Sequence, residues 1–252
     1  MNASAMTAML DDFSRAADWA LFLDLDGTLI DIASEPAKAR APAGLGVVLD
    51  DLHHALHGAL AVISGRPLAD VDRILRPLAL AGAGQHGAEL RHLRGGRVVQ
   101  PRPPRAMRRI AERVIATMPE GALVEDKGHS IAVHYRRAPH LARMVKARVA
   151  RALAPDRHEA HVLHGKMVAE VKTNGIDKGQ AIDALMALPP FRGRVPVFLG
   201  DDRTDEDGFA AVLRRGGHAV RVGDGPFFAG GPCLADPDAV RRWLSALRAA
   251  LD

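Results

Sequence analysis

Two aspartates only two residues apart are the first feature of this sequence that packing alone does not explain. Asp24 and Asp26 stand at the end of an apolar run and precede Gly27 and Thr28. In a strand, alternate side chains leave on the same face, so these carboxylates would lie together among apolar neighbours, where they repel each other and lose water. An Asp-Gly turn explains Asp26 alone but not Asp24. A divalent cation and a phosphoryl group would account for both, because one carboxylate can bind metal and attack phosphorus while the other transfers protons.

The apolar run Val195–Leu199 leads into a second cluster of acidic residues. The last three acids, Asp205 to Asp207, can be explained as first-turn acids of a helix that Thr204 caps. That explanation does not reach Asp201 and Asp202, which precede the cap at the carboxyl end of the strand. Ligands of open α/β sheets bind at such ends, and hard oxygen ligands from two strand ends suit Mg²⁺.

A lysine and a serine could bind an anion near these acids. Asp177 is a good helix N-cap, which places Lys178 in the first turn, against the positive end of the helix dipole. A bound anion would reverse the sign of that interaction. Ser64 ends the apolar run Ala59–Ile63 and could donate a hydrogen bond to the same anion. The alternatives are a tolerated surface lysine and an ordinary turn serine.

The elements that carry these residues alternate between strand and helix. This alternation predicts a doubly wound α/β sheet of the Rossmann type, in which buried parallel strands alternate with amphipathic helices. The expected strands are 20–24, 59–63, 78–81, 195–199 and 218–222, and the expected helices are 45–56, 67–75, 178–188, 205–215 and 238–251.

The middle of the chain follows a different pattern, helix-strand-strand repeated twice. Short turns join the expected strands of each pair, so this segment predicts a smaller α+β domain with an antiparallel sheet. Proline residues at 101, 103 and 104 and the step at 173–175 mark its ends. We therefore expect a core domain of residues 1–101 and 173–252, with residues 102–172 inserted between its two parts.

Composition narrows the setting and the partner. The chain has 252 residues, one cysteine (Cys233), a net charge of +4 and only 4% aromatic residues. A lone cysteine indicates a reducing compartment, so a cytoplasmic location is expected, and the first ten residues lack the basic start of a secretory signal. Few aromatic residues argue against nucleic acid, and no apolar stretch is long enough to span a membrane. A small anionic substrate is the preferred partner, and a monomer is favoured.

At this point four pieces resemble, in chain order, the motifs of the haloacid dehalogenase superfamily of phosphotransferases: residues 24–28, Ser64, Lys178 and residues 200–205. The resemblance implies that Asp24 is the nucleophile and forms an aspartyl-phosphate, and that Asp26 is the general acid and then the base. It also implies that the insert is a type-2 cap. The implied phosphate ligands are Ser64, Lys178, Gly27 and Thr28, and the implied Mg²⁺ site comprises Asp24, Asp26 through its carbonyl, Asp201 and Asp202, with Asp202 and Asp205 ordering the metal's waters.

Several longer phrases are similar to those of trehalose-6-phosphate phosphatases. They include SGRP (64–67), GQHGAE (84–89), EDKGHS (125–130), VHYR (133–136) and GDDRTDED (200–207). This likeness implies hydrolysis of trehalose 6-phosphate to trehalose and phosphate, and it implies that Lys127, Glu170 and Lys172 grip the sugar hydroxyls. His86 either joins this contact between core and cap or is a simple turn residue. In the expected strand 167–172, period-2 alternation separates Glu170 and Lys172 from Ala169 and Val171, although such residues can also merely face solvent.

Other readings of the sequence carry less. The histidines at 158, 161 and 164 have a spacing that suggests zinc, yet a strand sends the last two to opposite faces. Residues 82–87 match GxGxxG, but no helix pattern begins there, which argues against a dinucleotide site. Another sugar phosphatase, or a phosphomutase such as one acting on mannose phosphates, would keep the same acids. A non-catalytic phosphoaspartate switch needs neither Asp26 nor the insert.

Overall fold

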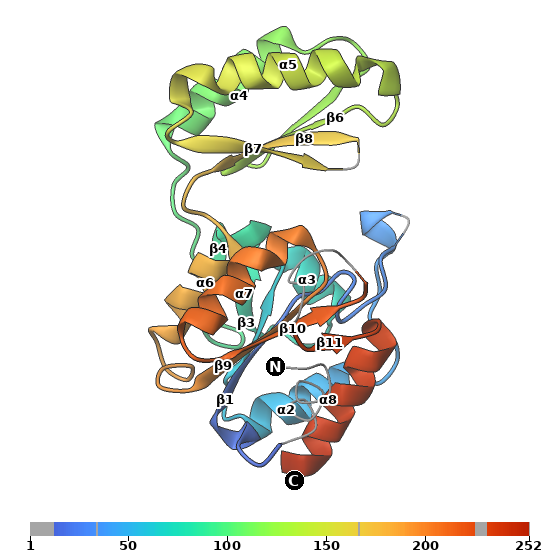
Figure 1. Cartoon of the computed structure of the whole chain (residues 1–252), viewed down its shortest axis with the longest axis vertical. Coiled ribbons are helices and arrows are strands. Elements are labelled where there is room, and N and C mark those ends of the chain that lie inside the picture. The colour runs from blue at the N-terminus through green and yellow to red at the C-terminus, as the bar shows by residue number, and fades with distance from the viewer. Residues whose placement is uncertain (1–12, 34, 166, 225–230, 252) are drawn as a thin grey trace. The chain divides into compact units, whose positions relative to one another are not determined.

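The computed structural model describes residues 13–33, 35–165, 167–224 and 231–251 of the chain (Figure 1). The chain divides into two compact units. The core unit comprises residues 1–100 and 177–252, and the inserted unit comprises residues 101–176. Each unit has a hydrophobic core of its own.

The core unit is built on a seven-stranded sheet in which every neighbouring pair is parallel except the last, β3 with β4. The central strand β1 lies between β9 and β2 and is buried at all five positions. In sheet order the strands are β11 (Cys233–Leu234), β10 (His218–Val222), β9 (Val195–Gly200), β1 (Trp19–Leu23), β2 (Leu60–Ile63), β3 (Ala81–Gly84) and β4 (Glu89–Arg91).

Helices cover both faces of this sheet, as the doubly wound prediction requires (Figure 1). Helix α6 packs against α7, and on the other face α2 packs against α8. Both layers bury their apolar residues against the central strands in one continuous core. The helices are α2 (Leu45–Ala55), α3 (Leu68–Ile74), α6 (Lys178–Met186), α7 (Glu206–Arg214) and α8 (Pro237–Leu251).

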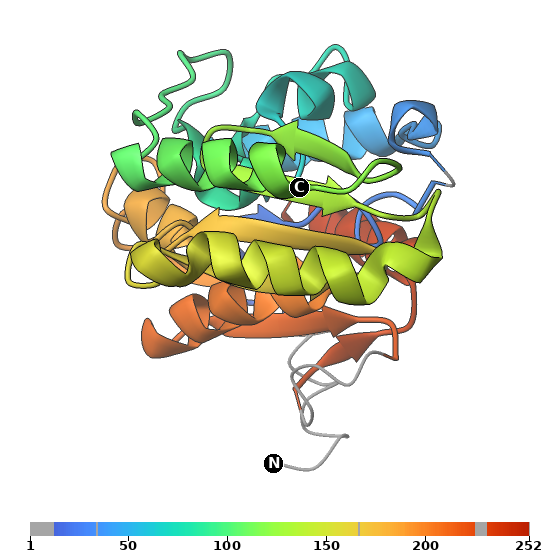
Figure 2. The ribbon, with the colours of Figure 1, turned by 90° about the horizontal axis from the view of Figure 1, so that it is seen from above.

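The inserted unit is a four-stranded antiparallel sheet with two helices on one face. The strand order is β5-β6-β8-β7, and Figure 2 shows α4 and α5 lying side by side over the strands. Asp156 ties the helix layer together, because its carboxylate accepts hydrogen bonds from Arg109 and Arg113 of α4. The elements are α4 (Arg105–Thr117), β5 (Leu123–Asp126), β6 (Ser130–His134), α5 (Ala142–Leu153), β7 (Ala160–Gly165) and β8 (Val168–Thr173).

Some boundaries differ from those that the sequence predicts. The expected strand at 78–81 is instead β3 at Ala81–Gly84, because Leu78 and Leu80 are buried in the segment that leads to the strand. The inserted unit ends four residues later than expected, since Asn174 still bonds to the carbonyls of His158 and Glu159. Among the residues described, no helix is both long and apolar enough to cross a membrane.

Candidate active site

The order of the strands brings the predicted residues to one edge of the core sheet. Asp24 follows β1, Ser64 follows β2 and Asp201 follows β9, and these three strands are parallel neighbours. The backbone N–H of Asp24 still donates to the Leu199 carbonyl at 2.9 Å, so a hydrogen bond to β9 fixes the backbone of this residue just after β1. The carboxyl ends of β1 and β9 therefore carry carboxylates beside each other. These two strands form the topological switch point of the sheet, because the strands that follow β1 in the chain lie on its other side.

A buried lysine joins two of the carboxylates. Lys178 Nζ donates to Asp24 Oδ1 at 2.7 Å and to Asp205 Oδ1 at 2.6 Å, and all three side chains are almost fully buried. Burial acts to lower the pKa of Lys178, but the charges of Asp205 and Asp24 outweigh it and raise that pKa above its usual value. The lysine is therefore a permanent cation in the site. Its position follows from the sequence as predicted, since Asp177 caps α6 by accepting from Gln180 N–H and places Lys178 in the first turn.

The nucleophile candidate carries more negative charge around it than Lys178 can balance. Burial raises the pKa of the Asp24 carboxyl well above the usual value, and the charges of Asp205 and Asp201 add to the effect while Lys178 opposes it. Burial, followed by the charge of Asp205, raises the pKa of Asp201 to about 6. Removal of these carboxylates from water has a cost that a second cation in the site would offset.

The turn after β1 is shaped to let Asp201 approach it. Gly27 has a φ of +85°, and a Cβ atom there would lie 2.1 Å from Asp201 Oδ2. The next residue, Thr28, is fully buried, and its hydroxyl donates to Asp201 Oδ1 at 3.1 Å. Gly27 is therefore required for the close approach of the two strand ends, and Thr28 orients a carboxylate rather than standing free.

The acids at 202 and 205 have structural partners of their own. Asp205 is fully buried and accepts from the backbone N–H groups of Asp201 at 3.0 Å and Asp202 at 2.9 Å. The exposed Asp202 is the N-cap of the short 3₁₀ helix Arg203–Asp205 that precedes α7. The prediction that Thr204 caps the helix expected at 205–215 is wrong, because α7 begins at Glu206 with Asp205 at its N-cap, and the capping box lies earlier, between Asp202 and Asp205.

The carboxylates of Asp24, Asp201 and Asp205 form a group that could hold a metal ion. One oxygen from each lies within 4.8 Å of the others. Asp205 is already engaged by Lys178 and two N–H groups, which leaves Asp24 and Asp201 with the most free acceptor capacity. Oxygen ligands of this kind suit a hard divalent cation. No comparable group of histidine, cysteine or acidic residues occurs elsewhere in the described segments.

The second aspartate of the pair is held apart from this cluster. Arg66 grips Asp26 with two hydrogen bonds, from Nε to Oδ2 at 2.6 Å and from Nη2 to Oδ1 at 2.7 Å. The sequence alone assigns no role to Arg66. Its only signal there was its position two residues after Ser64 in the SGRP phrase, which says nothing about a partner forty residues earlier.

The loop that carries Ser64 packs against a turn at His86, whose φ is positive. Ser64 is buried, and its hydroxyl accepts from the Arg66 N–H at 3.1 Å. His86 has a φ of +57°, donates its N–H to the Ser64 carbonyl at 2.9 Å and lies against Gly65, where a Cβ atom would meet its ring at 2.7 Å. His86 therefore supports the Ser64 loop, and its expected contact with sugar stays a prediction.

In the inserted unit, two of the three residues expected to bind sugar share the sheet face opposite the helices, where Glu170 is half-buried and Lys172 is buried. In β8, Ala169 and Val171 join the core under α4 and α5, so Glu170 and Lys172 belong to the opposite face, as period-2 alternation predicts. Lys127 pairs with Glu125 at 3.6 Å. Glu125 Oε2 also lies 3.3 Å from His134 Nε2. Neither Glu125 nor His134 was among the sugar-binding residues expected from the sequence. Their signal was alternation in β5 and β6, which places Glu125 opposite Ala132 and hence on the row of Glu170.

Comparison with known proteins identifies the family. A family model described as trehalose-phosphatase matches residues 22–225. The chain belongs to the trehalose-phosphatase family. It is 41% identical over 241 residues to the trehalose-6-phosphate phosphatase of Escherichia coli strain K12, across 94% of this chain and 89% of the relative. It is 40% identical over 222 residues to a probable trehalose-phosphate phosphatase of Sinorhizobium fredii, across 87% and 81% of the two chains.

Solved structures support the fold. The C-terminal domain of a trehalose-6-phosphate phosphatase from C. albicans superposes with a TM-score of 0.76 at 22% identity, over 97% of each chain. An Aspergillus fumigatus trehalose-6-phosphate phosphatase superposes with a TM-score of 0.70 at 24% identity, over 99% of each chain. The doubly wound core with an inserted α+β unit is therefore the fold of this family, as predicted.

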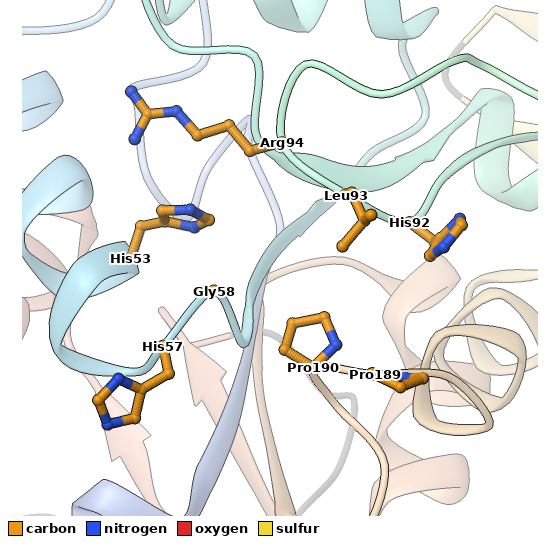
Figure 3. Close-up of a pocket in the computed structure, with 8 residues that line it drawn as sticks. All are labelled: His53, His57, Gly58, His92, Leu93, Arg94, Pro189 and Pro190. Atoms are coloured by element: carbon orange, nitrogen blue, oxygen red, sulfur yellow. The ribbon is translucent and has the colours of Figure 1, made fainter.

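The core unit has a hollow at the amino ends of its strands, at the opposite end of the sheet from Asp24. It encloses about 610 Å³ between the turn before β2, the chain after β4 and the turn before β9 (Figure 3). His53, His57, His92 and Arg94 contribute its polar groups. Burial lowers the pKa of His53, and nearby Arg94 adds to the effect. The nitrogens of these histidines do not form a group that could share a metal ion.

The cluster around Lys178 predicts a large effect of a single isosteric change. Asp205→Asn removes one carboxylate charge from a buried lysine that bonds to two. We expect the metal-free protein to lose about 2 kcal/mol of unfolding free energy, because Lys178 loses one of its two charge-assisted hydrogen bonds while its pair with Asp24 remains. Urea denaturation followed by circular dichroism measures the loss. Glu206→Gln, one residue later and exposed, is the control and should stay within about 0.5 kcal/mol of the wild type. A similar small change in Asp205→Asn would contradict the assignment.

Proposed function

We propose that this protein hydrolyses trehalose 6-phosphate to trehalose and inorganic phosphate through a phosphorylated Asp24. The observation that carries the chemistry is the buried Asp24 carboxylate at a sheet edge, bonded to Lys178 and beside Asp201. Membership of the trehalose-phosphatase family supports the substrate, since the bacterial relatives that bear this name match along most of their length. The free and exposed Cys233 is consistent with work in a reducing cytoplasm.

In the first half-reaction, a carboxylate oxygen of Asp24 attacks phosphorus and forms an acyl phosphate. The bond between phosphorus and the sugar oxygen breaks, and Asp26 gives its proton to that oxygen, so that neutral trehalose leaves. Lys178 neutralises negative charge on the transferring phosphoryl oxygens, and the Ser64 hydroxyl donates a hydrogen bond to one of them. The backbone that carries both groups is fixed by the α6 cap and by the turn at His86.

In the second half-reaction, water attacks the phosphorus of the aspartyl-phosphate. Asp26, now ionised, takes a proton from that water, and the bond between phosphorus and the Asp24 oxygen breaks. Inorganic phosphate leaves, Asp24 returns as a carboxylate, and Asp26 again carries the proton for the next cycle. One aspartate therefore handles phosphorus and the other handles protons.

The residues present fit a divalent cation, and we propose Mg²⁺. Asp24 and Asp201 would bind it with the backbone carbonyl of Asp26, while Asp202 and Asp205 orient its waters. Bound Mg²⁺ supplies positive charge that stabilises the phosphoryl oxygens in the transition state. The raised pKa values of Asp24 and Asp201 support this assignment, because they indicate carboxylates whose charge is not fully balanced by the protein itself.

We propose that Lys127, Glu170 and Lys172 bind the hydroxyl groups of the sugar. Charged side chains distinguish a hydroxyl-rich leaving group from a small aryl group, because each hydroxyl needs a partner that replaces water. The shared sheet face of Glu170 and Lys172 in the inserted unit supports this role.

The nucleophile is tested by Asp24→Asn, which keeps the shape of the side chain and removes its charge. We expect phosphate release from trehalose 6-phosphate with Mg²⁺ to fall to background, and excess EDTA to do the same to the wild type. A malachite-green assay over a panel of sugar phosphates measures both effects and ranks the substrates. Substantial turnover by Asp24→Asn, or full activity in EDTA, would refute the mechanism.

Asp26→Asn tests the proton-transfer role through the leaving group. Trehalose is a poor leaving group and needs a proton, whereas nitrophenolate departs without one. We therefore expect kcat for trehalose 6-phosphate to fall by about 100-fold or more, and the first-turnover release of nitrophenolate to fall much less. Stopped-flow absorbance gives the second rate. Equal losses on the two substrates would show that acid catalysis is not the main role of Asp26.

Metal binding should depend on pH with a definite sign. Because the folded state raises the pKa values of Asp24 and Asp201, the metal-free protein holds protons there that the unfolded chain releases. The stability that comes from Asp201 is lost as pH rises through its folded-state pKa of about 6. A cation replaces those protons, so we expect Mg²⁺ to raise Tm more at about pH 7.5 than at about pH 5.5. Differential scanning fluorimetry measures the shifts, with Asp201→Asn as the control that should lose the difference. Equal Mg²⁺ shifts at both pH values would argue against this site.

Glu170→Ala and Lys127→Ala test the sugar contacts. Loss of one hydrogen bond between a charged group and a hydroxyl should cut kcat/KM for trehalose 6-phosphate by at least about tenfold and leave nitrophenyl phosphate nearly unchanged. Steady-state kinetics on both substrates measure the ratio. Arg143→Ala, exposed on α5 of the same unit, is the control. Equal losses on both substrates would mean that these residues support the fold. Unchanged turnover of trehalose 6-phosphate would mean that they only face solvent.

A further inference from the structure

The strand that precedes Asp26 does not fix the direction of its side chain. It lies beyond the end of β1, its side chain is 31% exposed, and it precedes a glycine with positive φ. The contacts of its carboxylate in the described part of the chain are the two hydrogen bonds from Arg66. A carboxylate that must give a proton to one oxygen and take it from another needs a fixed direction, and here that direction comes from the guanidinium.

Besides its two bonds to Asp26, Arg66 is fixed by hydrogen bonds with three other residues. Its side chain is 13% exposed, and Nη1 donates to the Pro36 carbonyl at 2.8 Å while Nε and Nη2 hold Asp26. Its backbone N–H donates to Ser64 Oγ at 3.1 Å, and its carbonyl accepts from the Gln85 N–H at 2.9 Å. The guanidinium is therefore a rigid bracket built on the same loop as Ser64, and it extends from that loop to Asp26.

We propose that Arg66 is a positioning residue for Asp26, fixing the direction in which this carboxylate exchanges its proton. This inference rests on the proposed function, because it assigns to Asp26 the transfer of protons. Arg66 acts through Asp26 and contacts neither the phosphoryl group nor the sugar in the step that it supports.

The forked geometry leaves Asp26 able to act. A carboxylate has about four lone-pair sites, and a guanidinium bound side-on through two N–H groups takes one from each oxygen. One site on each oxygen stays open, and both open sites point away from Arg66. The proton that passes to the sugar oxygen, or arrives from water, therefore has to occupy one of these two sites. Lysine keeps the charge of arginine but not the fork, so it cannot define both directions.

The leaving group separates this role from a general structural one. In Arg66→Lys, we expect kcat for trehalose 6-phosphate to fall by at least about tenfold, since general acid catalysis contributes about 100-fold or more and depends on geometry. The first-turnover release of nitrophenolate should fall by less than about threefold, because that step needs no proton. Arg66→Gln serves as the second variant if the lysine variant folds poorly, and circular dichroism checks both.

A double-mutant cycle tests whether Arg66 acts through Asp26. In the Asp26→Asn background, adding Arg66→Lys should change kcat by less than about twofold, because the group that it positions is already gone. In the Asp24→Asn background, which binds substrate without turning it over, Arg66→Lys should leave the Kd of trehalose 6-phosphate within about twofold by calorimetry. A contact between Arg66 and substrate would weaken that Kd.

The chain offers a matched control in Arg91. It also forks onto an aspartate, with Nη1 and Nη2 at 2.8 and 2.6 Å from Asp72, and bonds to the Leu80 carbonyl. Asp72 is not in the site, so Arg91→Lys should lower Tm without changing the ratio of the two substrate rates.

The inference is overturned by equal losses on both substrates in Arg66→Lys, by an additive loss in the Asp26→Asn background, or by a tenfold weaker Kd. If the wild type releases no phosphate from any ester, the proposed function itself fails. If the wild type is active and Arg66→Lys matches it on trehalose 6-phosphate, only this inference fails.

Discussion

The burial of one ammonium group between two carboxylates is the interaction on which the rest of the core site depends. Lys178 lies in an almost solvent-free position, where an unpaired charge would be prohibitively costly, and Asp24 and Asp205 make that position possible. Each of the three groups needs the others, so the end of β1, the start of α6 and the turn before α7 are fixed relative to one another. Removal of Lys178 would leave two buried carboxylates without a counter-charge, and removal of either carboxylate would take away one of the two acceptors that hold the ammonium.

That constraint explains why the surrounding backbone is so closely specified. Asp205 can face Lys178 only because its other oxygen accepts the N–H groups of residues 201 and 202, which turns the chain sharply after β9. The same turn brings Asp201 against Gly27, where no side chain would fit. Stability and chemistry therefore use the same atoms: the hydrogen bonds that hold the turn also hold the carboxylates at a separation that a divalent cation can bridge.

The sequence predicted what periodicity and local chemistry control. Strand and helix alternation gave the doubly wound sheet, alternation in β8 put Glu170 and Lys172 on the open face, and the Asp177 cap placed Lys178. The wrong predictions concern an element boundary and a helix cap that depend on contacts between residues rather than on local sequence. Leu78 and Leu80 are as apolar as strand residues but pack in a connection. Thr204 does not cap α7, because a 3₁₀ helix capped by Asp202 comes first and α7 begins only at Glu206. The pairing of Arg66 with Asp26 depends on the fold and had no local signal.

In the proposed mechanism, the different partners of the two aspartates explain how residues so near in sequence can have different tasks. Asp24 bonds to a lysine and is buried beside other acids. Asp26 is partly exposed and bonds to an arginine, which leaves it reachable by a leaving group and by water. A lysine is a compact point charge that phosphoryl oxygens can share, whereas the planar fork of arginine fixes a direction. In the proposed mechanism the two cations therefore divide the work as the two acids do: Lys178 balances charge at phosphorus, and Arg66 fixes the direction of proton transfer.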